Sequence, residues 1–319
     1  SFLEKNVKLK ITSVFPSTTS AGVTAFLTGV PVKQHGLTGW FLYLKELGLV
    51  SRILPFTTRA GRVPLKGKGI KFSDIFQAKS IFKKIKADGY AIQHRDYAYS
   101  SYSLASTAGA KRLAFSSAPG FFTAIKKALA EKSRRKFIYA YWDGLDASCH
   151  KYGCRGRETL KHFQSLNKRI EAWAKTLTNA VLIISADHGL IDTAPDKIIK
   201  AEDNPEFADA LALPLCGEPR LVYCYVKAGE AARFEHYVRH NFKKYCELHK
   251  SADLVKKNFF GLFKANPKLS DRVGDYTLIM KDNYVIKDFL KGEERKPAGG
   301  VHGGVSREEM FVPLVVINK

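Results

Sequence analysis

Two short apolar runs constrain the fold of this chain most. Phe137–Trp142 (FIYAYW) and Ala180–Ser185 (AVLIIS) have the length of strands and are rich in residues that favour β-structure. A helix is expected between them, at His162–Thr176. Strands that are apolar on both faces and separated by helices are typical of a parallel sheet that is covered on both sides. The sequence therefore predicts an α/β fold with a mostly parallel central sheet and helices on both of its faces.

The remaining pattern divides the chain into a core and an insertion. From Gly217 the texture changes to an alternating strand, a highly charged helix and a further strand, which predicts a small α+β insertion at 217–295 within a core formed by 1–216 and 296–319. The core elements expected are strands at Ile11–Phe15, Tyr90–Gln93 and Val312–Ile317, and helices at Ala21–Thr28, Ser73–Lys86 and Ala118–Arg134. The insertion elements expected are strands at Arg220–Val226 and from Tyr276 to Met280, and a helix at Glu230–His249.

Polar side chains follow the two apolar strands and recur near the C-terminus. Asp146 and His150 come after the first strand, Asp187 and His188 come after the second, and His302 lies in a Gly-rich segment. The carboxyl edge of an open α/β sheet is where ligands bind. Aspartate and neutral histidine are usual ligands of Zn²⁺ and Mn²⁺, and an i, i+4 pair can face one ion if its segment is helical. Each motif alone is weak, but three together predict a metal site.

A run of hydroxyl side chains stands at a strand-to-helix turn. In Phe15–Gly29 (FPSTTSAGVTAFLTG), Pro16 ends the strand and Ser17–Ser20 precede an apolar helical stripe that stops at Gly29. Such a hydroxyl sits among unpaired N–H groups at the positive end of the helix dipole, where phosphate binds. Seen alone, the stretch fits an ordinary helix cap better than a phosphate site.

Taken together, these motifs resemble a known family. The segments FPSTT, YWDGLDASCHKYG, SADHG and HGG, followed by EEMFVPL, are similar to the type I phosphodiesterase/nucleotide pyrophosphatase branch of the alkaline phosphatase superfamily. The further segments GEPR (217–220), GLF (261–263) and RVGD (272–275) resemble uncharacterised bacterial members of that branch. The resemblance covers nearly the whole chain in the family's order.

The resemblance implies a phosphoesterase with two divalent metal ions, for which we expect Zn²⁺, with Mn²⁺ as the alternative. Asp146, His150 and His302 would hold one ion, and Asp187 and His188 the other. Thr19 would lie near both ions as the nucleophile and form a phospho-threonine intermediate. The expected substrate is an anionic phosphate-ester small molecule, for example a nucleotide, with a phosphodiester or pyrophosphate bond.

Two departures from the family pattern bear on this expectation. The family has a further Asp ligand at the end of its first strand, whereas this chain has no Asp before Asp74. We expect that ligand in a segment preceding Ser1, where any targeting sequence would also lie, and the alternative is that the site is incomplete. The nucleotide pyrophosphatases carry an Asn three residues after the nucleophile, where this chain has Gly22. This substitution leaves phosphomonoester or phosphonate hydrolysis on the same site as an alternative.

Charge and cysteine content suggest one more alternative function and a cellular compartment. The formal net charge of +22 attracts anionic substrates and, less specifically, nucleic acid, so a catalytically degenerate nucleic-acid-binding protein is the alternative from another class. The five cysteines form no CxxC pair, which favours a reducing compartment, and we expect a cytoplasmic protein. No uncharged apolar run reaches the roughly 18 residues that suggest a membrane span.

Overall fold

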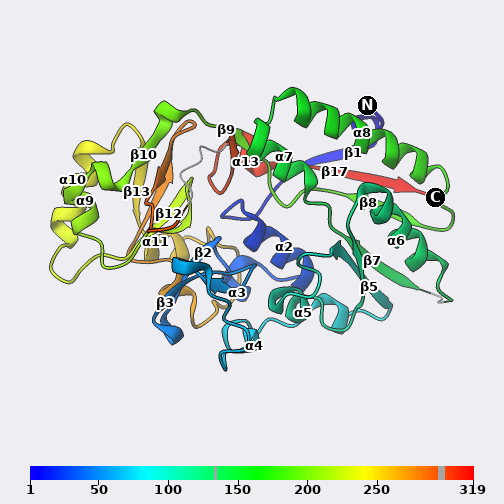
Figure 1. The fold of residues 1–319 in the computed structure, drawn as a ribbon, viewed down its shortest axis with the longest axis horizontal. Helices are drawn as coiled ribbons and strands as arrows, with labels where there is room; N and C mark the ends of the chain where they lie inside the picture. The colour runs from blue at the N-terminus through cyan, green and yellow to red at the C-terminus, as the bar shows by residue number, and fades with distance from the viewer. Residues whose placement is uncertain (133–134, 294–298) are drawn as a thin grey trace.

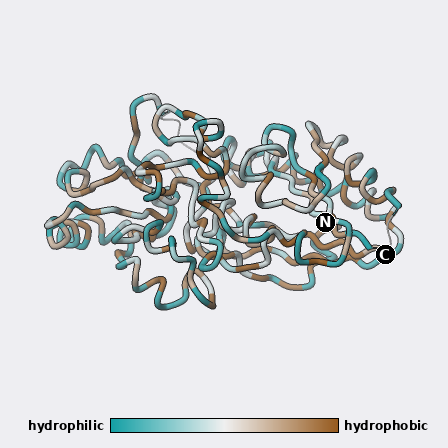
Figure 2. The backbone as a smooth tube through the Cα atoms, turned by 90° about the horizontal axis from the view of Figure 1, so that it is seen from below, coloured by the Kyte–Doolittle hydropathy of each residue, from teal (hydrophilic) through white to brown (hydrophobic). Residues whose placement is uncertain are grey.

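The computed structural model describes residues 1–132, 135–293 and 299–319. Two lobes lie side by side along the long axis of the molecule, and α2 (Thr19–Thr28) lies between them (Figure 1). Both chain termini lie in the same lobe, at one end of the molecule (Figures 1 and 2). No helix among the described residues has both the length and the apolar character needed to cross a membrane.

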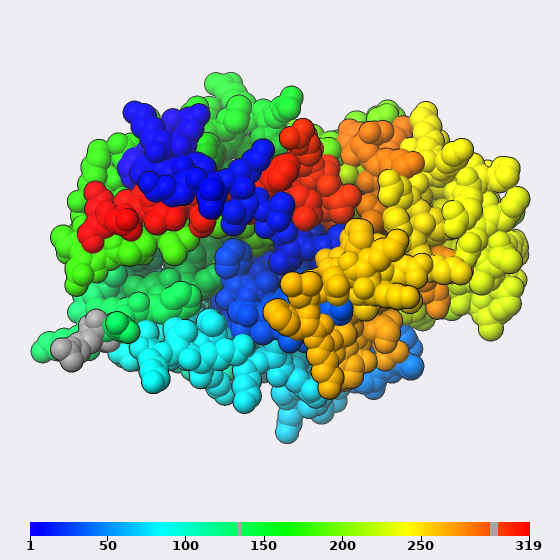
Figure 3. Space-filling model, turned by 180° about the vertical axis from the view of Figure 1, so that it is seen from behind, coloured from blue at the N-terminus to red at the C-terminus, as the bar shows by residue number. Residues whose placement is uncertain are grey.

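The lobe that contains the termini is built on two three-stranded sheets. In the first, β5 (Asp88–His94) runs parallel to both of its neighbours, β6 (Lys111–Phe115) and β7 (Lys136–Ala140). In the second, β17 (Phe311–Asn318) lies antiparallel between β1 (Val7–Thr12) and β8 (Val181–Ile184). The N-terminal residues and the C-terminal strand are therefore neighbours, as Figure 3 shows from behind. The helices of this lobe are α1 (Phe2–Lys5), α5 (Ser101–Ser106), α6 (Ala118–Ala130), α7 (Gly144–Tyr152), α8 (Arg157–Ala174) and α13 (Arg307–Met310).

The other lobe contains a seven-stranded antiparallel sheet. Its order is β13 (Cys246–Lys250), β14 (Tyr276–Met280), β12 (Leu221–Cys224), β11 (Cys216–Glu218), β2 (Phe41–Leu44), β3 (Leu49–Arg52) and β4 (Thr57–Thr58). Its helices are α3 (Val32–His35), α4 (Phe72–Ile75), α9 (Pro205–Asp209), α10 (Ala231–Asn241), α11 (Ser251–Lys256) and α12 (Leu269–Arg272). Two-stranded sheets join β10 (Ile198–Lys200) to β15 (Val285–Lys287) and β9 (Ile191–Asp192) to β16 (Gly300–Val301).

The predicted α/β character is present, but the mostly parallel sheet is not confirmed. Within the described residues, parallel pairing occurs in β6–β5–β7 and in β10–β15, and the other strand pairs are antiparallel. One reason is that β17 returns along the edges of β1 and β8 in the opposite direction. The seven-stranded sheet takes strands from both sides of residue 217, so the proposed division into core and insertion stays a prediction.

Several predicted elements differ from those observed. The helix predicted at Ser73–Lys86 is the single turn α4, a break at Phe76, and a 3-10 turn at Ile81–Lys83. The break lets Phe72 and Phe76 pack into the core, where the ring of Phe72 meets those of Phe56 and Tyr102. Core packing thus overrides helical periodicity here.

The boundaries of three other predicted elements also changed. The helix predicted at Glu230–His249 ends at Asn241, because Cys246–Lys250 instead forms a strand that pairs with β14. The first strand ends at Thr12, before the residues predicted to belong to it at Val14 and Phe15. Helix α6 ends at Ala130, and Arg134, the predicted end, lies outside the described residues.

Two strand edges beside each other have no partner within the described ranges. β7 pairs with β5 alone and β8 pairs with β17 alone, yet both strands run toward the same group of polar residues. Ile138 of β7 and Ile184 of β8 belong to one hydrophobic cluster with residues of α8, so the two edges are near each other. On the other face of β8, Val181 and Ile183 are 64% and 62% exposed. These strands are therefore less buried than the predicted two-sided cover requires.

Candidate active site

The predicted nucleophile stands at the first turn of a helix. α2 begins at Thr19, has Thr18 as its N-cap and ends at Thr28, and its C-cap Gly29 adopts the left-handed conformation that is usual for a helix stop. The backbone N–H groups of Ala21 and Gly22 bond to the carbonyl of Thr18. The earlier N–H groups of the helix have no intrahelical acceptor and are available to an anion.

The hydroxyl of Thr19 faces the second predicted metal-ligand pair. Its Oγ1 lies 3.0 Å from Nε2 of His188. Nδ1 of His188 lies 2.9 Å from the carbonyl oxygen of Gly189, which can only accept, so the imidazole proton resides on Nδ1. Nε2 therefore carries a lone pair, which accepts a hydrogen bond from the Thr19 hydroxyl. An unprotonated ring nitrogen of this kind is also what a metal ion binds.

The three residues predicted to hold the first ion lie together. Ligand atoms of Asp146, His150 and His302 are all within 4.8 Å of one another. Asp146 and His150 lie one turn apart on α7, and His302 comes from the loop after β16. Nδ1 of His150 donates to the carbonyl of Gly300 at 2.7 Å, which leaves its Nε2 free, 3.5 Å from Oδ2 of Asp146.

Two buried atoms of this group have no hydrogen-bond partner among the described residues. They are Oδ1 of Asp146 and Nδ1 of His302. Burial raises the pKa of Asp146, against the opposing effect of His150 and His188. Burial and the neighbouring His188 and His150 hold the pKa of His302 well below its ordinary value, so that ring is neutral. A carboxylate with an unpaired oxygen beside the neutral His302 ring fits a divalent cation.

The two predicted ligand sets adjoin through stacked imidazole rings. The rings of His188 and His302 stack with centroids 3.9 Å apart, and those of His150 and His302 lie 5.2 Å apart. Asp187 is anchored by Tyr141, whose hydroxyl donates to Oδ2 at 3.3 Å. The structure thus brings Thr19, Asp146, His150, Asp187, His188 and His302 into one region at the carboxyl ends of β7 and β8.

Sequence reasoning assigned no role to four side chains around this region. Tyr141 contacts Asp187, Glu218 contacts the N-cap of α2, and Arg220 pairs with Glu309 beside the His302 loop. Glu218 and Arg220 belong to the GEPR segment, which pointed to the family without a function attached. His35 lies outside this group: it is the last residue of α3, and its Nδ1 accepts from the N–H of Leu37 at 3.1 Å.

The family is shown by a comparison of sequences. The sequence profile described as type I phosphodiesterase / nucleotide pyrophosphatase matches residues 1–304. The chain belongs to this family. The prediction of an enzyme of the phosphodiesterase/nucleotide pyrophosphatase type is thereby confirmed. The chain that carries the candidate metal ligands is therefore a member of a phosphoesterase family. No curated protein matches the chain.

Solved structures show the same fold. The murine ectonucleotide pyrophosphatase/phosphodiesterase 5 is 16% identical, with a TM-score of 0.68 over 96% of this chain and 78% of its own. An inactive variant of that protein has been solved in complex with AMP. Phosphonoacetate hydrolase from Sinorhizobium meliloti 1021, in complex with phosphonoformate, is 20% identical, with a TM-score of 0.67 over 98% of this chain and 82% of its own.

Proposed function

We propose that this protein is a two-metal-dependent phosphoesterase that hydrolyses phosphodiester or pyrophosphate bonds through Thr19. The observation that carries the proposal is the position of the Thr19 hydroxyl. It lies at the N-terminus of α2, 3.0 Å from Nε2 of His188, whose ring stacks on the His302 of the candidate metal group. A hydroxyl, free helix N–H groups and a cluster of metal-type ligands are the parts needed for phosphoryl transfer.

In this proposal Asp146, His150 and His302 would hold one divalent cation, and Asp187 and His188 the other, with Thr19 near both. Two such cations lower the pKa of a hydroxyl and neutralise charge on the phosphoryl oxygens. We expect Zn²⁺, because the ligand set is histidine and aspartate, with Mn²⁺ as the alternative.

The chain's own groups would act in two steps. Thr19 Oγ1 loses its proton to solvent and forms a bond to phosphorus as the bond to the leaving oxygen breaks, and the leaving oxygen takes up a proton from solvent, which gives phospho-threonine and an alcohol or phosphate product. Water then attacks the same phosphorus, the bond from phosphorus to Oγ1 breaks, and Oγ1 takes up a proton, which releases the phosphate product and restores the hydroxyl. The first N–H groups of α2 stabilise negative charge on the phosphoryl oxygens in both steps.

The test uses Zn²⁺- or Mn²⁺-loaded protein with bis-p-nitrophenyl phosphate and p-nitrophenyl phosphate. We expect turnover of the diester, loss of that turnover to background in Thr19→Ala, and partial activity in Thr19→Ser, which keeps a hydroxyl. No turnover of either compound with either metal, or undiminished turnover in Thr19→Ala, would contradict the proposal.

A second candidate is phosphonate or phosphomonoester hydrolysis on the same site. It is favoured by Gly22 and by the similarity to a phosphonate hydrolase fold. Preference for p-nitrophenyl phosphate or phosphonoacetate over the diester would establish it. Binding of nucleic acid by a protein that is inactive toward all three compounds would instead support the alternative that the basic charge suggested.

A further inference from the structure

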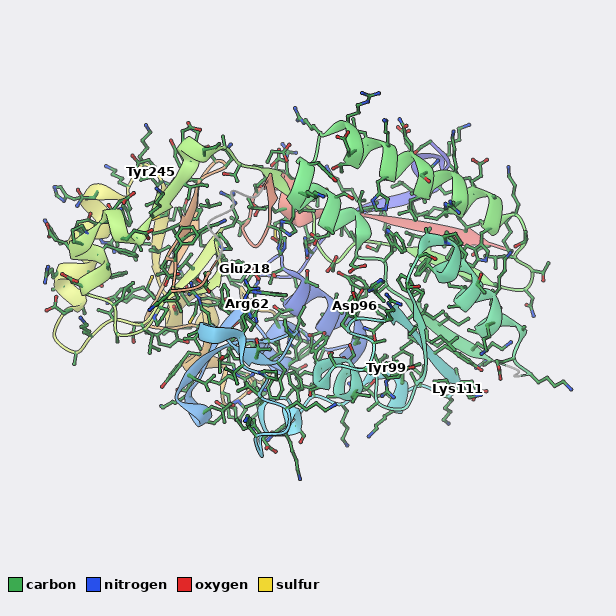
Figure 4. The ribbon with its side chains drawn as sticks, in the orientation of Figure 1. Arg62, Asp96, Tyr99, Lys111, Glu218 and Tyr245 are labelled. Atoms are coloured by element: carbon green, nitrogen blue, oxygen red, sulfur yellow. The ribbon has the colours of Figure 1, made fainter. Side chains whose placement is uncertain are left out.

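The segment Gly217–Arg220 reaches from the seven-stranded sheet into the candidate active site. Its first two residues end β11 and its last two form the turn to β12, and its two charged residues are buried, with Glu218 8% and Arg220 1% exposed. Figure 4 shows Glu218 where the two lobes meet, beside α2. Buried charges are costly unless they are paired and hydrogen-bonded, so the partners of these two side chains indicate what they hold in place.

Glu218 holds the residue that precedes the nucleophile. Its Oε1 accepts the hydroxyl of Thr18 at 2.5 Å and the backbone N–H of Trp40 at 2.8 Å. Thr18 is the N-cap of α2, yet its side chain makes no capping bond to the helix. Its hydroxyl donates to Glu218 instead, and this hydrogen bond connects the start of α2 to the lobe with the seven-stranded sheet.

Arg220 holds the loop that carries His302. Its guanidinium donates to both carboxylate oxygens of Glu309, at 3.2 and 2.9 Å, in a pair with both side chains at most 1% exposed. Oε1 of Glu309 accepts the backbone N–H of Gly304 at 2.8 Å. The carbonyl of Gly304 in turn accepts the hydroxyl of Ser17 at 2.7 Å.

These contacts close a ring of residues. Arg220, two residues after Glu218, is hydrogen-bonded to Glu309, which is hydrogen-bonded to Gly304, which is hydrogen-bonded to Ser17. Ser17 precedes Thr18 in the chain, and the hydrogen bond from Thr18 to Glu218 closes the ring. The ring contains the two residues before Thr19 and a residue two positions after His302. It therefore fixes the nucleophile turn and one metal-ligand loop relative to each other.

We propose that Glu218 and Arg220 are positioning residues of this enzyme, which set the Thr19 hydroxyl against the His302 loop through Thr18 and Gly304. The expected effect on kcat rests on the proposed function, whereas the ring of hydrogen bonds does not depend on it. A misplacement of about 1 Å at a reacting group costs roughly a hundredfold in rate. The ring thus acts on kcat, whereas substrate affinity depends on groups outside it.

The kinetic test compares Thr18→Val and Ser17→Ala with Thr28→Val. Thr28 is the matched control, because its buried hydroxyl also bonds on α2, to the carbonyl of Thr24, but away from the site. We expect Thr18→Val and Ser17→Ala each to lower kcat roughly ten- to a hundredfold, with KM within about twofold. Thr18→Ser, which keeps the hydroxyl, should restore kcat, and Thr28→Val should leave it unchanged.

A double-mutant cycle connects Thr18 to Glu218. Glu218→Gln keeps an oxygen that can accept from Thr18 and Trp40, so it should retain most of kcat, whereas Glu218→Ala removes both hydrogen bonds and should lose at least as much as Thr18→Val. The double variant Thr18→Val/Glu218→Ala should lose no more than the worse single variant, because both single changes remove the same hydrogen bond between Thr18 and Glu218. Additive losses, or wild-type kcat in Thr18→Val and Ser17→Ala, would overturn the proposal.

Amide hydrogen exchange tests the ring without activity. Loss of the Thr18 or Ser17 hydroxyl should speed exchange in the segment around Gly304 by several-fold, and Thr28→Val should not. If the wild type is inactive with both metals but this exchange difference is found, the proposed function fails and the positioning ring stands. If exchange around Gly304 is the same in all variants, the ring does not couple the two segments and the inference is wrong.

Discussion

Gly22 packs directly against Asp187. A Cβ atom at Gly22 would lie 2.8 Å from the carbonyl oxygen of Asp187 and 2.9 Å from its Cβ, closer than side chains approach. The helix that carries Thr19 and the loop that carries Asp187 and His188 therefore meet with no space between them. The position at which the nucleotide pyrophosphatases, by resemblance, carry an Asn can hold no side chain here without movement of α2. The glycine is thus a condition of the short distance between Thr19 and His188.

We expect Gly22→Asn to lower activity rather than to convert the site to the pyrophosphatase pattern. The added side chain would push α2 away from Asp187, and overpacking of this kind costs about 1–3 kcal/mol of stability. The measurements are diester turnover and thermal unfolding, with Gly22→Ala as the smallest overpacked variant. Phe26→Ala is the control, because Phe26 lies on the same helix and is 48% exposed. Higher diesterase activity in Gly22→Asn would contradict this interpretation.

A second prediction separates the metal role of Asp146 from its role in folding. Burial opposes ionisation of Asp146, so an asparagine should leave the metal-free protein as stable as the wild type or more stable. The same change should remove the stabilisation by Zn²⁺, which for a bound ion at a thousand times its Kd is about 4 kcal/mol. Thermal unfolding of wild type and Asp146→Asn, in EDTA and in Zn²⁺, measures both effects.

The matched control for that experiment is Asp143→Asn. Asp143 precedes α7 and is not part of the ligand group of Asp146, His150 and His302. The Asp143→Asn variant should therefore be stabilised by Zn²⁺ as much as the wild type is. Equal responses of the two variants to Zn²⁺ would show that the metal binds elsewhere.

A third prediction concerns acid. His35 is fully buried, and burial lowers its pKa to about 3, with nearby Arg272 acting in the same direction. The unfolded chain takes up this proton near pH 6.5 and the folded chain does not, so stability is complete above pH 6.5 and falls as the pH drops toward 3. The full loss from this group is about 5 kcal/mol.

Unfolding in urea between pH 4 and 7, with EDTA present, checks the acid prediction. His35→Gln has no such proton to take up, so its free energy of unfolding should fall less steeply over this range than that of the wild type. His240→Gln is the control, because His240 lies exposed on α10. Parallel pH curves for wild type and His35→Gln would exclude His35 as a source of acid sensitivity.

The candidate site could be predicted from the sequence further than the sheet could. Asp146 and His150 lie four residues apart, and a helix alone brings them to one face, so local spacing was enough. Asp187 and His188 follow a recognisable apolar strand, which places them at its end. Sheet direction is a property of partners distant in the chain, and nothing in Val312–Ile317 indicates that this strand lies antiparallel between β1 and β8.

The residues that hold the site together were hidden for a related reason. Glu218, Arg220 and Glu309 look like surface charges in a basic chain, and their burial follows only from the meeting of the two lobes. In the same way, the apolar spacing of Ser73–Lys86 fits a helix as well as it fits the two short turns that are observed. Gly22 looks like a neutral helix position, and only its approach to Asp187 shows why a larger residue does not fit.

The open edge of β8 leads to the last prediction. Val181 and Ile183 are more than 60% exposed on a strand with one paired edge within the described part of the chain, and such edges promote association between molecules. We expect the 319-residue chain to self-associate as its concentration rises, and Ile183→Lys to reduce this, because a charge on an edge strand opposes pairing. Sedimentation velocity over a range of concentrations measures the effect.

Phe263→Ser is the control for that measurement, because Phe263 is 72% exposed but belongs to no strand. If self-association responds to Phe263→Ser and not to Ile183→Lys, exposed apolar area in general is responsible and the strand edge is not. If Ile183→Lys alone lowers it, the edge of β8 accepts a strand.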